Sequence, residues 1–193
     1  MACEIKHKYS GNILFSCETE SLKKCVEEAV RNYIPLLNAD LHDADLRGAY
    51  LVGDFGYANF GGADLRGAYL GRANLSGCNF GGSDLRGAYL GEAWMEDTNL
   101  SGAKLDGAEL GEAGKLIGDR PIMQISPIGS RSDFLVAYIT DKGIFLKTGC
   151  VFGTIENFKL ATQKTHGENE YAEEYSAALS LIEVHKKIYM QKK

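Results

Sequence analysis

The chain has 193 residues, 45% of them hydrophobic, which is enough to bury a core, and its net charge of −5 leads us to expect no direct binding of nucleic acid. The N-terminus carries charges where a signal peptide needs an apolar stretch, and the longest apolar run, Phe134 to Ile139, is too short to span a bilayer, so we expect neither secretion nor membrane insertion. Five cysteines, an odd number without C-x-x-C spacing, argue against a disulfide framework or a structural zinc site, which makes a cytoplasmic protein the expectation.

Residues 1–35 are predicted to form an N-terminal cap made of a β-hairpin and a helix. The strands are expected at 5–9 and 12–17, and a helix over 19–33 places its apolar residues on one face. Because the open end of a repetitive fold exposes backbone and core, such a cap is expected before the repeats that follow.

Residues 36–118 are predicted to form a solenoid, because they repeat with a short period. The block Ala-Asp-Leu-Arg-Gly-Ala-Tyr-Leu occupies 44–51 and 63–70, and it returns at 83–90 with Ser in place of the first Ala. A large apolar residue recurs every five positions with a small residue two before it, which fits neither a helix nor a plain strand. A coil that turns a corner every five residues points both residues inward, and four sides close one turn of about twenty residues. The inward ladders are Leu46, Leu65, Leu85 and Leu105; Leu51, Leu70, Leu90 and Leu110; Phe55, Leu75 and Met95; and Phe60, Phe80 and Leu100.

The run of A-[DN]-[LF]-x-x units resembles the pentapeptide-repeat family over about 80 of the 193 residues. The resemblance implies a β-solenoid, a right-handed quadrilateral β-helix, here of about four coils. One residue is missing between Leu51 and Phe55, so we expect a local irregularity there, eased by Gly53 and Gly56.

Columns of acids, bases and tyrosines are predicted on the outside of the solenoid. In the last coil the signs of the two charged columns are exchanged: Lys104 continues the acid column above Asp84, and Asp106 continues the base column above Arg86. This exchange predicts ion pairs between neighbouring coils. The charged columns either stabilise the solenoid or form a face that binds a partner, and the tyrosines are either a partner platform or ordinary strand surface residues. The acids are Asp45, Asp64 and Asp84, the bases are Arg47, Arg66 and Arg86, and the tyrosines are Tyr50, Tyr69 and Tyr89.

Residues 119–193 are predicted to form a small α+β domain, since the five-residue period is lost after Gly118. The segment resembles the tail of pentapeptide-repeat proteins encoded by phages and prophages, which brings a phage origin into consideration. The expected elements are strands at 123–126, 133–140 and 144–148, a helix capped by Thr154 that stops at Gly167, and a helix over 169–190.

The sequence holds no pattern typical of an enzyme. The four histidines belong to separate predicted elements without metal-ligand spacing, and only Cys150 and His166 could act as nucleophile and base. A buried inert cysteine and a histidine at a helix end account for the same two residues. We therefore expect no enzymatic activity, no metal and no cofactor.

The acidity of the chain lies in the repeats, because residues 36–120 carry thirteen acids and seven bases while the flanking segments are nearly balanced. The family resemblance implies that an acidic β-helix can imitate duplex DNA and bind DNA gyrase or a related topoisomerase. We expect such a protein to inhibit or protect its target enzyme, and a phage-defence nuclease is a further candidate target. A rod this short would need to pair end to end as a homodimer. The alternative is a rigid spacer whose C-terminal domain recognises a protein partner. The acids expected to matter are Glu92, Glu96, Asp97, Glu109 and Glu112.

Overall fold

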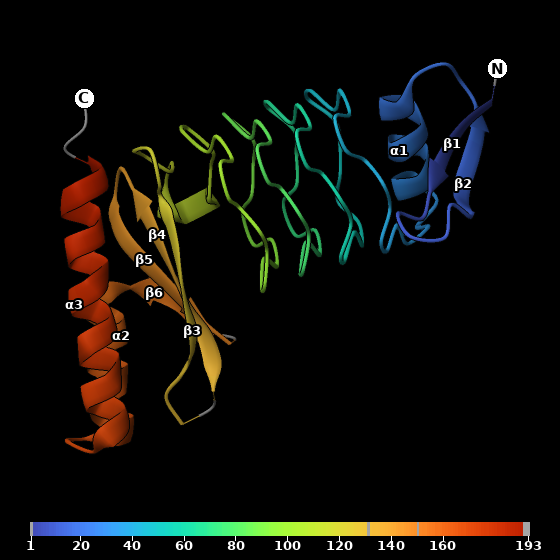
Figure 1. Cartoon of the computed structure of the whole chain (residues 1–193). Helices are drawn as coiled ribbons and strands as arrows, with labels where there is room; N and C mark the ends of the chain where they lie inside the picture. The colour runs from blue at the N-terminus through green and yellow to red at the C-terminus, as the bar shows by residue number, and fades with distance from the viewer. Residues whose placement is uncertain (1, 131, 150, 191–193) are drawn as a thin grey trace. The chain divides into compact units, whose positions relative to one another are not determined.

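The computed structural model describes residues 2–130, 132–149 and 151–190 (Figure 1). The chain divides into two compact units, Met1–Glu112 and Ala113–Lys193. The first holds a hairpin, a helix and the repeats, and the second holds a four-stranded sheet and two helices. Among the described helices, none is both long enough and apolar enough to cross a membrane.

The predicted hairpin is present, with its strands shifted along the chain. Strand β1 (Ala2–Lys6) pairs antiparallel with β2 (Ile13–Glu18), and the register slips between Ile5 and Lys6. The first strand ends before the predicted Tyr9 because the chain turns there to meet the first repeat. His7 forms an antiparallel bridge with Ala39, and the carbonyl of Lys6 accepts a 2.8 Å hydrogen bond from the N–H of Asp40.

Helix α1 (Leu22–Arg31) lies against this hairpin. It begins after Ser21, whose hydroxyl accepts a hydrogen bond from the N–H of Lys24, so the helix is shorter than the predicted span of 19–33. The residues that it buries recur at helical spacing, which gives the single apolar face expected from the sequence. They are Cys25, Val26, Ala29 and Val30.

The repeats wind into coils whose sides are joined by parallel bridges. Asp64 pairs with Asp84, and the next bridges along the same coil follow five residues apart, at Tyr69, Asn74 and Asn79. Each bridge joins a residue to its equivalent in the next coil. The bridge between Asp64 and Asp84 is flanked by a hydrogen bond of 2.8 Å from the N–H of Leu65 to the carbonyl of Asp84. Four bridged sides therefore make up one coil, with the strand-like spacing expected from the sequence.

A tight turn separates consecutive sides. The N–H of Ala49 donates to the carbonyl of Leu46, and Gly48 between them has a φ of 60°, the positive value that a type II turn requires at its third residue. Gly holds this position in most repeats, but Tyr57, Arg72 and Glu92 adopt the same left-handed conformation. The turn is therefore imposed by the coil as well as by glycine.

The interior of the coils is filled by the predicted ladders. Phe60 and Phe80 stack with ring centroids 4.9 Å apart and planes 2° from parallel. Cys78, in a small inward position, is fully buried, and its thiol donates to the carbonyl of Phe55 at 3.0 Å. Leu100, near the end of the ladders, is only partly buried.

The predicted irregularity lies between Tyr50 and Asp54. Tyr50 pairs with Tyr69, nineteen residues on, whereas Asp54 pairs with Asn74, twenty residues on. Neither Gly53 nor Gly56 has a positive φ, so these glycines contribute space rather than a left-handed backbone. Glycine is needed there for space, since a Cβ on Gly53 would lie 3.3 Å from Cγ2 of Val30 in α1.

In the second unit, four antiparallel strands form a sheet in the order β3-β4-β5-β6. The three predicted strands are present, and the fourth, β6, was not predicted because Val-Phe-Gly-Thr is short and contains a glycine. Before the sheet, a single 3-10 turn occupies Gly111–Ala113. The strands are β3 (Ile122–Ile128), β4 (Asp133–Thr140), β5 (Gly143–Thr148) and β6 (Val151–Thr154).

Helices α2 (Ile155–His166) and α3 (Glu170–Met190) follow the sheet and cover one of its faces (Figure 1). The predicted cap of α2 is confirmed, because Oγ1 of Thr154 accepts the N–H of Asn157 at 3.2 Å and Gly167, with a φ of 59°, ends the helix. The core beneath the helices joins side chains of the strands, including Leu135 and Leu146, to side chains of the helices, including Phe158, Leu179 and Ile182.

Candidate protein-binding surface

The acid and base columns of the repeats are joined into close ion pairs. Arg47 donates from Nε to Oδ1 of Asp45 at 2.8 Å and from Nη2 to Oδ2 at 2.6 Å, and Oδ1 also accepts the N–H of Arg47. The same three bonds join Arg66 to Asp64. They also join Arg86 to Asp84. Each carboxylate is therefore bound by the arginine two residues on in its own repeat.

Contacts between coils are longer than these pairs. Nε of Arg47 lies 3.7 Å from Oδ2 of Asp64, and Nε of Arg66 lies 4.0 Å from Oδ2 of Asp84. In the Asp and Arg columns the closest partners lie within one repeat, because a two-residue spacing across a turn lets the guanidinium fold back onto the carboxylate. Lys104, expected over Asp84, is in register with it and helps to lower its pKa, after the larger effect of the arginine.

The arginines keep the acid column ionised. Side-chain hydrogen bonds from Arg47 lower the pKa of Asp45 to about 2, and hydrogen bonds from their own arginines lower the pKa of Asp64 and of Asp84. With every charge matched in this way, the face carries little net charge. It fits the interpretation in which the columns stabilise the coils.

The tyrosine column forms a continuous stack on the next side. The rings of Tyr50 and Tyr69 lie 5.5 Å apart, and those of Tyr69 and Tyr89 lie 4.7 Å apart, with interplanar angles of 6° and 10°. Tyr50 is 51% exposed and Tyr69 is 43% exposed, so the outer part of the stack is open to a partner. A Cβ on Gly71 would lie 2.6 Å from Cε1 of Tyr89, so glycine beside the stack makes room for the ring.

A ladder of amide side chains, which the sequence reasoning missed, occupies another side. Nδ2 of Asn79 donates to Oδ1 of Asn59 at 2.9 Å, and Nδ2 of Asn99 donates to Oδ1 of Asn79 at 2.8 Å. Asp40 begins the column by accepting from Asn59 at 3.1 Å. Asparagine in the position before the large apolar residue, repeated every twenty residues, was the available signal.

Unbalanced negative charge is concentrated in one part of the repeats, residues 91–112, which we call the acidic coil. It holds six acids and a single base, Lys104. Glu92 is bound by Arg72, with Nε 3.0 Å from Oε2, and Glu96 accepts the hydroxyl of Ser76 at 3.1 Å. Asp97 is exposed and has a φ of 56°. The predicted acids therefore lie in one coil, some of them already partnered by the coil before.

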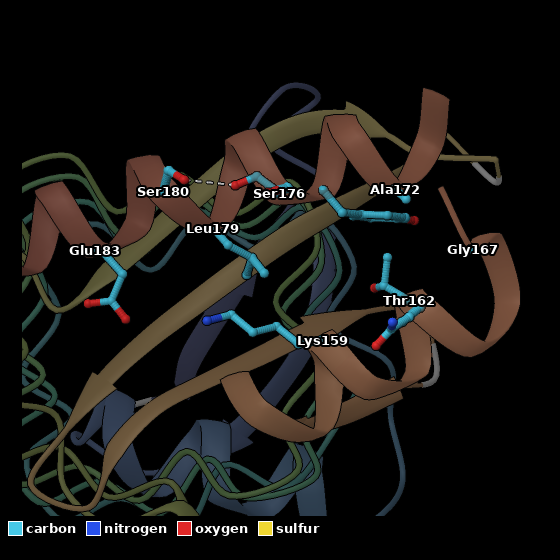
Figure 2. A pocket seen from close by; sticks show the side chains of 10 residues that line it. Lys159, Thr162, Gly167, Ala172, Ser176, Leu179, Ser180 and Glu183 are labelled. Atoms are coloured by element: carbon cyan, nitrogen blue, oxygen red, sulfur yellow. Dashed lines mark hydrogen bonds between the residues drawn. The ribbon is translucent and has the colours of Figure 1, made fainter. Parts of the chain in front are cut away.

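The second unit carries a groove between α2 and α3 (Figure 2). Its volume is about 360 Å³, and Tyr175 and Leu179 form its apolar part. Figure 2 shows Lys159 of α2 facing α3. The polar residues along the groove are Lys159, Thr162, Gln163, Ser176, Ser180 and Glu183.

A separate feature of the second unit is an exposed apolar strip on α3. Leu181, Val184 and Ile188, at spacings of three and four, are each about half exposed, and Leu160 of α2 is 67% exposed. The opposite side of α3 is buried in the core of the unit. Helix α3 therefore carries apolar residues on two sides, one side in the core of the unit and the other exposed.

The one catalytic pairing considered from the sequence, Cys150 with His166, stays a hypothesis. Cys150 lies outside the described residues, and His166 lies beside the rings of Tyr171 and Tyr175, at 5.6 and 5.8 Å. Burial raises the pKa of the Cys78 thiol to about 12, as expected of an inert core cysteine. Within the described parts of the chain, no group of His, Cys, Asp and Glu side chains could hold a metal ion.

Comparison with known proteins gives a clear family. The model of pentapeptide repeats matches residues 54–91 and 83–113, with eight copies. A comparison with curated proteins gave no match. The matched repeats imply the right-handed type of β-helix, in agreement with the bridged coils.

Several solved structures are similar to part of the chain. A pentapeptide repeat protein from Nostoc PCC 7120 is 35% identical, with 46% of this chain and 78% of that chain covered and a TM-score of 0.41. A pentapeptide repeat protein from Cyanothece 51142 is 35% identical, with 37% and 56% covered and a TM-score of 0.27. One from the Arabidopsis thaliana thylakoid lumen is 32% identical, with 39% and 57% covered and a TM-score of 0.25.

Proposed function

We propose that this chain, which belongs to the pentapeptide-repeat family, is a non-catalytic protein-binding module whose acidic coil occupies the DNA-binding surface of a nucleic-acid enzyme. Pentapeptide-repeat proteins are generally non-catalytic structural or binding proteins. The observation that carries the proposal is the excess of acids in residues 91–112. Candidate targets are DNA gyrase, another topoisomerase or a phage-defence nuclease, and a phage origin of the chain would make the target a host enzyme.

The charge density sets the geometry of such a complex. About four coils give a rod of about 20 Å. Its net charge of −6 over residues 36–120 corresponds to about one charge per 3 Å, whereas duplex DNA carries one per about 1.7 Å. The Asp and Arg columns are matched, so the imitation of DNA is confined to the acidic coil. Two copies joined end to end would lengthen the acidic surface, and we therefore include a homodimer in the proposal.

The proposal is tested by capturing partners from a bacterial lysate at low and high salt and identifying them by mass spectrometry. Asp97→Asn neutralises one exposed acid of the acidic coil, and Asp106→Lys reverses the charge of a second. Asparagine tolerates the left-handed backbone at position 97. Glu168→Gln combined with Glu173→Lys makes the same change of net charge in the second unit. Loss of a nucleic-acid enzyme with the first pair but not the second, and at high salt, supports imitation of DNA.

A second function, recognition by the C-terminal unit with the repeats as a rigid spacer, is favoured by the exposed strip on α3. Apolar contacts of this kind persist at high salt. Leu181→Gln combined with Ile188→Gln should then abolish capture of the partner, whereas the acidic-coil variant should retain it. The opposite pattern assigns binding to the acidic coil.

A further inference from the structure

Three cysteines far apart in the sequence meet in the N-terminal hairpin and helix. Cys3 of β1 and Cys17 of β2 are directly opposed partners in the antiparallel pair. Directly opposed residues of such a pair have Cα atoms about 4.5–5.5 Å apart and project from the same face of the sheet. This separation falls within the range of about 4.4–6.8 Å that a disulfide spans.

Cys25 of α1 covers this pair. Its side chain is fully buried, and its thiol donates to the carbonyl of Cys3 at 3.4 Å. Burial, followed by hydrogen bonds with the Cys17 and Cys3 thiols, raises the pKa of the Cys25 thiol. Cys25 therefore stays protonated, while Cys3 and Cys17 are only half buried and can be reached by a small oxidant.

We propose that Cys3 and Cys17 form a reversible redox site that a peroxide converts to a cross-strand disulfide. The thiolate of one cysteine attacks a peroxide oxygen, breaks the O–O bond and becomes a sulfenic acid, and the departing oxygen leaves as water after protonation. The second thiolate attacks the sulfenic sulfur, the S–S bond forms, and the S–O bond breaks to release a second water. Two thiols are oxidised and one hydrogen peroxide is reduced to two waters.

The geometry favours a bond that is easily reduced again. Opposed Cβ atoms in a strand pair are about 4.5–5.5 Å apart. A relaxed disulfide holds its Cβ atoms about 3.5–4.5 Å apart. Closing the bond therefore pulls the strands together slightly, and strained, accessible disulfides are the labile ones.

The bond would act on the repeats through the hairpin. Lys6, three residues after Cys3, accepts a hydrogen bond from Asp40, and the N–H of Lys8 donates to the carbonyl of Asn38 at 2.8 Å. Oxidation therefore strengthens the segment that continues the hydrogen bonding of the first coil. This inference does not depend on the proposed function.

The test uses the full chain carrying Cys150→Ser, so that this cysteine cannot join two molecules or exchange with the pair. The protein is treated with hydrogen peroxide, digested without reduction and mapped by mass spectrometry, and its free thiols are counted. We expect a peptide joining Cys3 to Cys17, a loss of two thiols, and a rise in the melting temperature of the first unit on the order of 5–10 °C that dithiothreitol reverses.

Cys17→Ser in the same background is the matched control and should lose both the cross-link and the temperature shift. Two outcomes would overturn the redox site: a cross-link of Cys25 instead, or oxidation to sulfinic acid without a disulfide. A Cys3–Cys17 bond that leaves the melting temperature unchanged would overturn the stabilising effect on the first unit.

Discussion

Removing one aromatic ring from the interior of the coils should make the first unit much easier to unfold. Phe80 is fully buried, and its ring stacks on Phe60 at 4.9 Å. Phe80→Ala removes this ring from the column that continues to Leu100. We expect a loss of about 3–5 kcal/mol in the free energy of unfolding of the first unit, because neighbouring coils are fixed by their bridges and cannot collapse into the space.

The assay is urea unfolding followed by the fluorescence of Trp94, the single tryptophan of the chain, which lies within the repeats and therefore reports the first unit. Phe80→Leu supplies a residue that the same column already accepts and should cost about 1 kcal/mol. Phe152→Ala, at a half-exposed site in the second unit, should leave the Trp94 transition unchanged. A loss below about 1 kcal/mol for Phe80→Ala, at an unchanged denaturant slope, would refute the reasoning.

Three further predictions concern the coils. The hydrogen bonds from Arg47 lower the pKa of Asp45 to about 2, so they stabilise the folded state above the unfolded pKa of about 3.9, and this stabilisation is lost as the pH falls through about 2. Asp45→Asn should therefore reduce the difference in melting temperature between pH 5 and pH 2. Asn79→Ala breaks the amide ladder at both neighbours and should cost about 1–3 kcal/mol in urea unfolding, and an unchanged midpoint would contradict the role of the ladder. Gly77→Ala should lower the free energy of unfolding more than Gly87→Ala does. Both glycines have left-handed backbones, but only at Gly77 would a Cβ overlap a ring, that of Tyr57. Equal midpoints of urea unfolding for the two variants would show that the overlap is relieved without cost.

Much of the C-terminal unit could be predicted because its signals are local. The apolar run of β4 and the caps at Thr154 and Gly167 act through neighbouring residues, so the sequence alone places these elements. Strand β6 carries no such signal. It is a strand because β5 offers it an edge, and Phe152 of β6 stacks on Phe145 of β5 with ring centroids 5.7 Å apart.

The period of five determined the coil and its inward ladders, because each position of the repeat meets its own equivalent in the next coil. The same period does not predict which partners the outward side chains bind. Arg47 folds onto Asp45 of its own repeat, and Asn79 joins its column by amide hydrogen bonds; both outcomes depend on turn geometry and side-chain reach.

The sequence by itself determined the repeat, its buried ladders and the concentration of acids, since period and composition are properties of neighbouring residues. Tertiary structure alone decided where distant residues meet. It makes Gly53 a contact for Val30, and it gathers Cys3, Cys17 and Cys25 between a hairpin and a helix. The physical reason is that the contacts of a side chain depend on how separate elements pack, which no local period encodes.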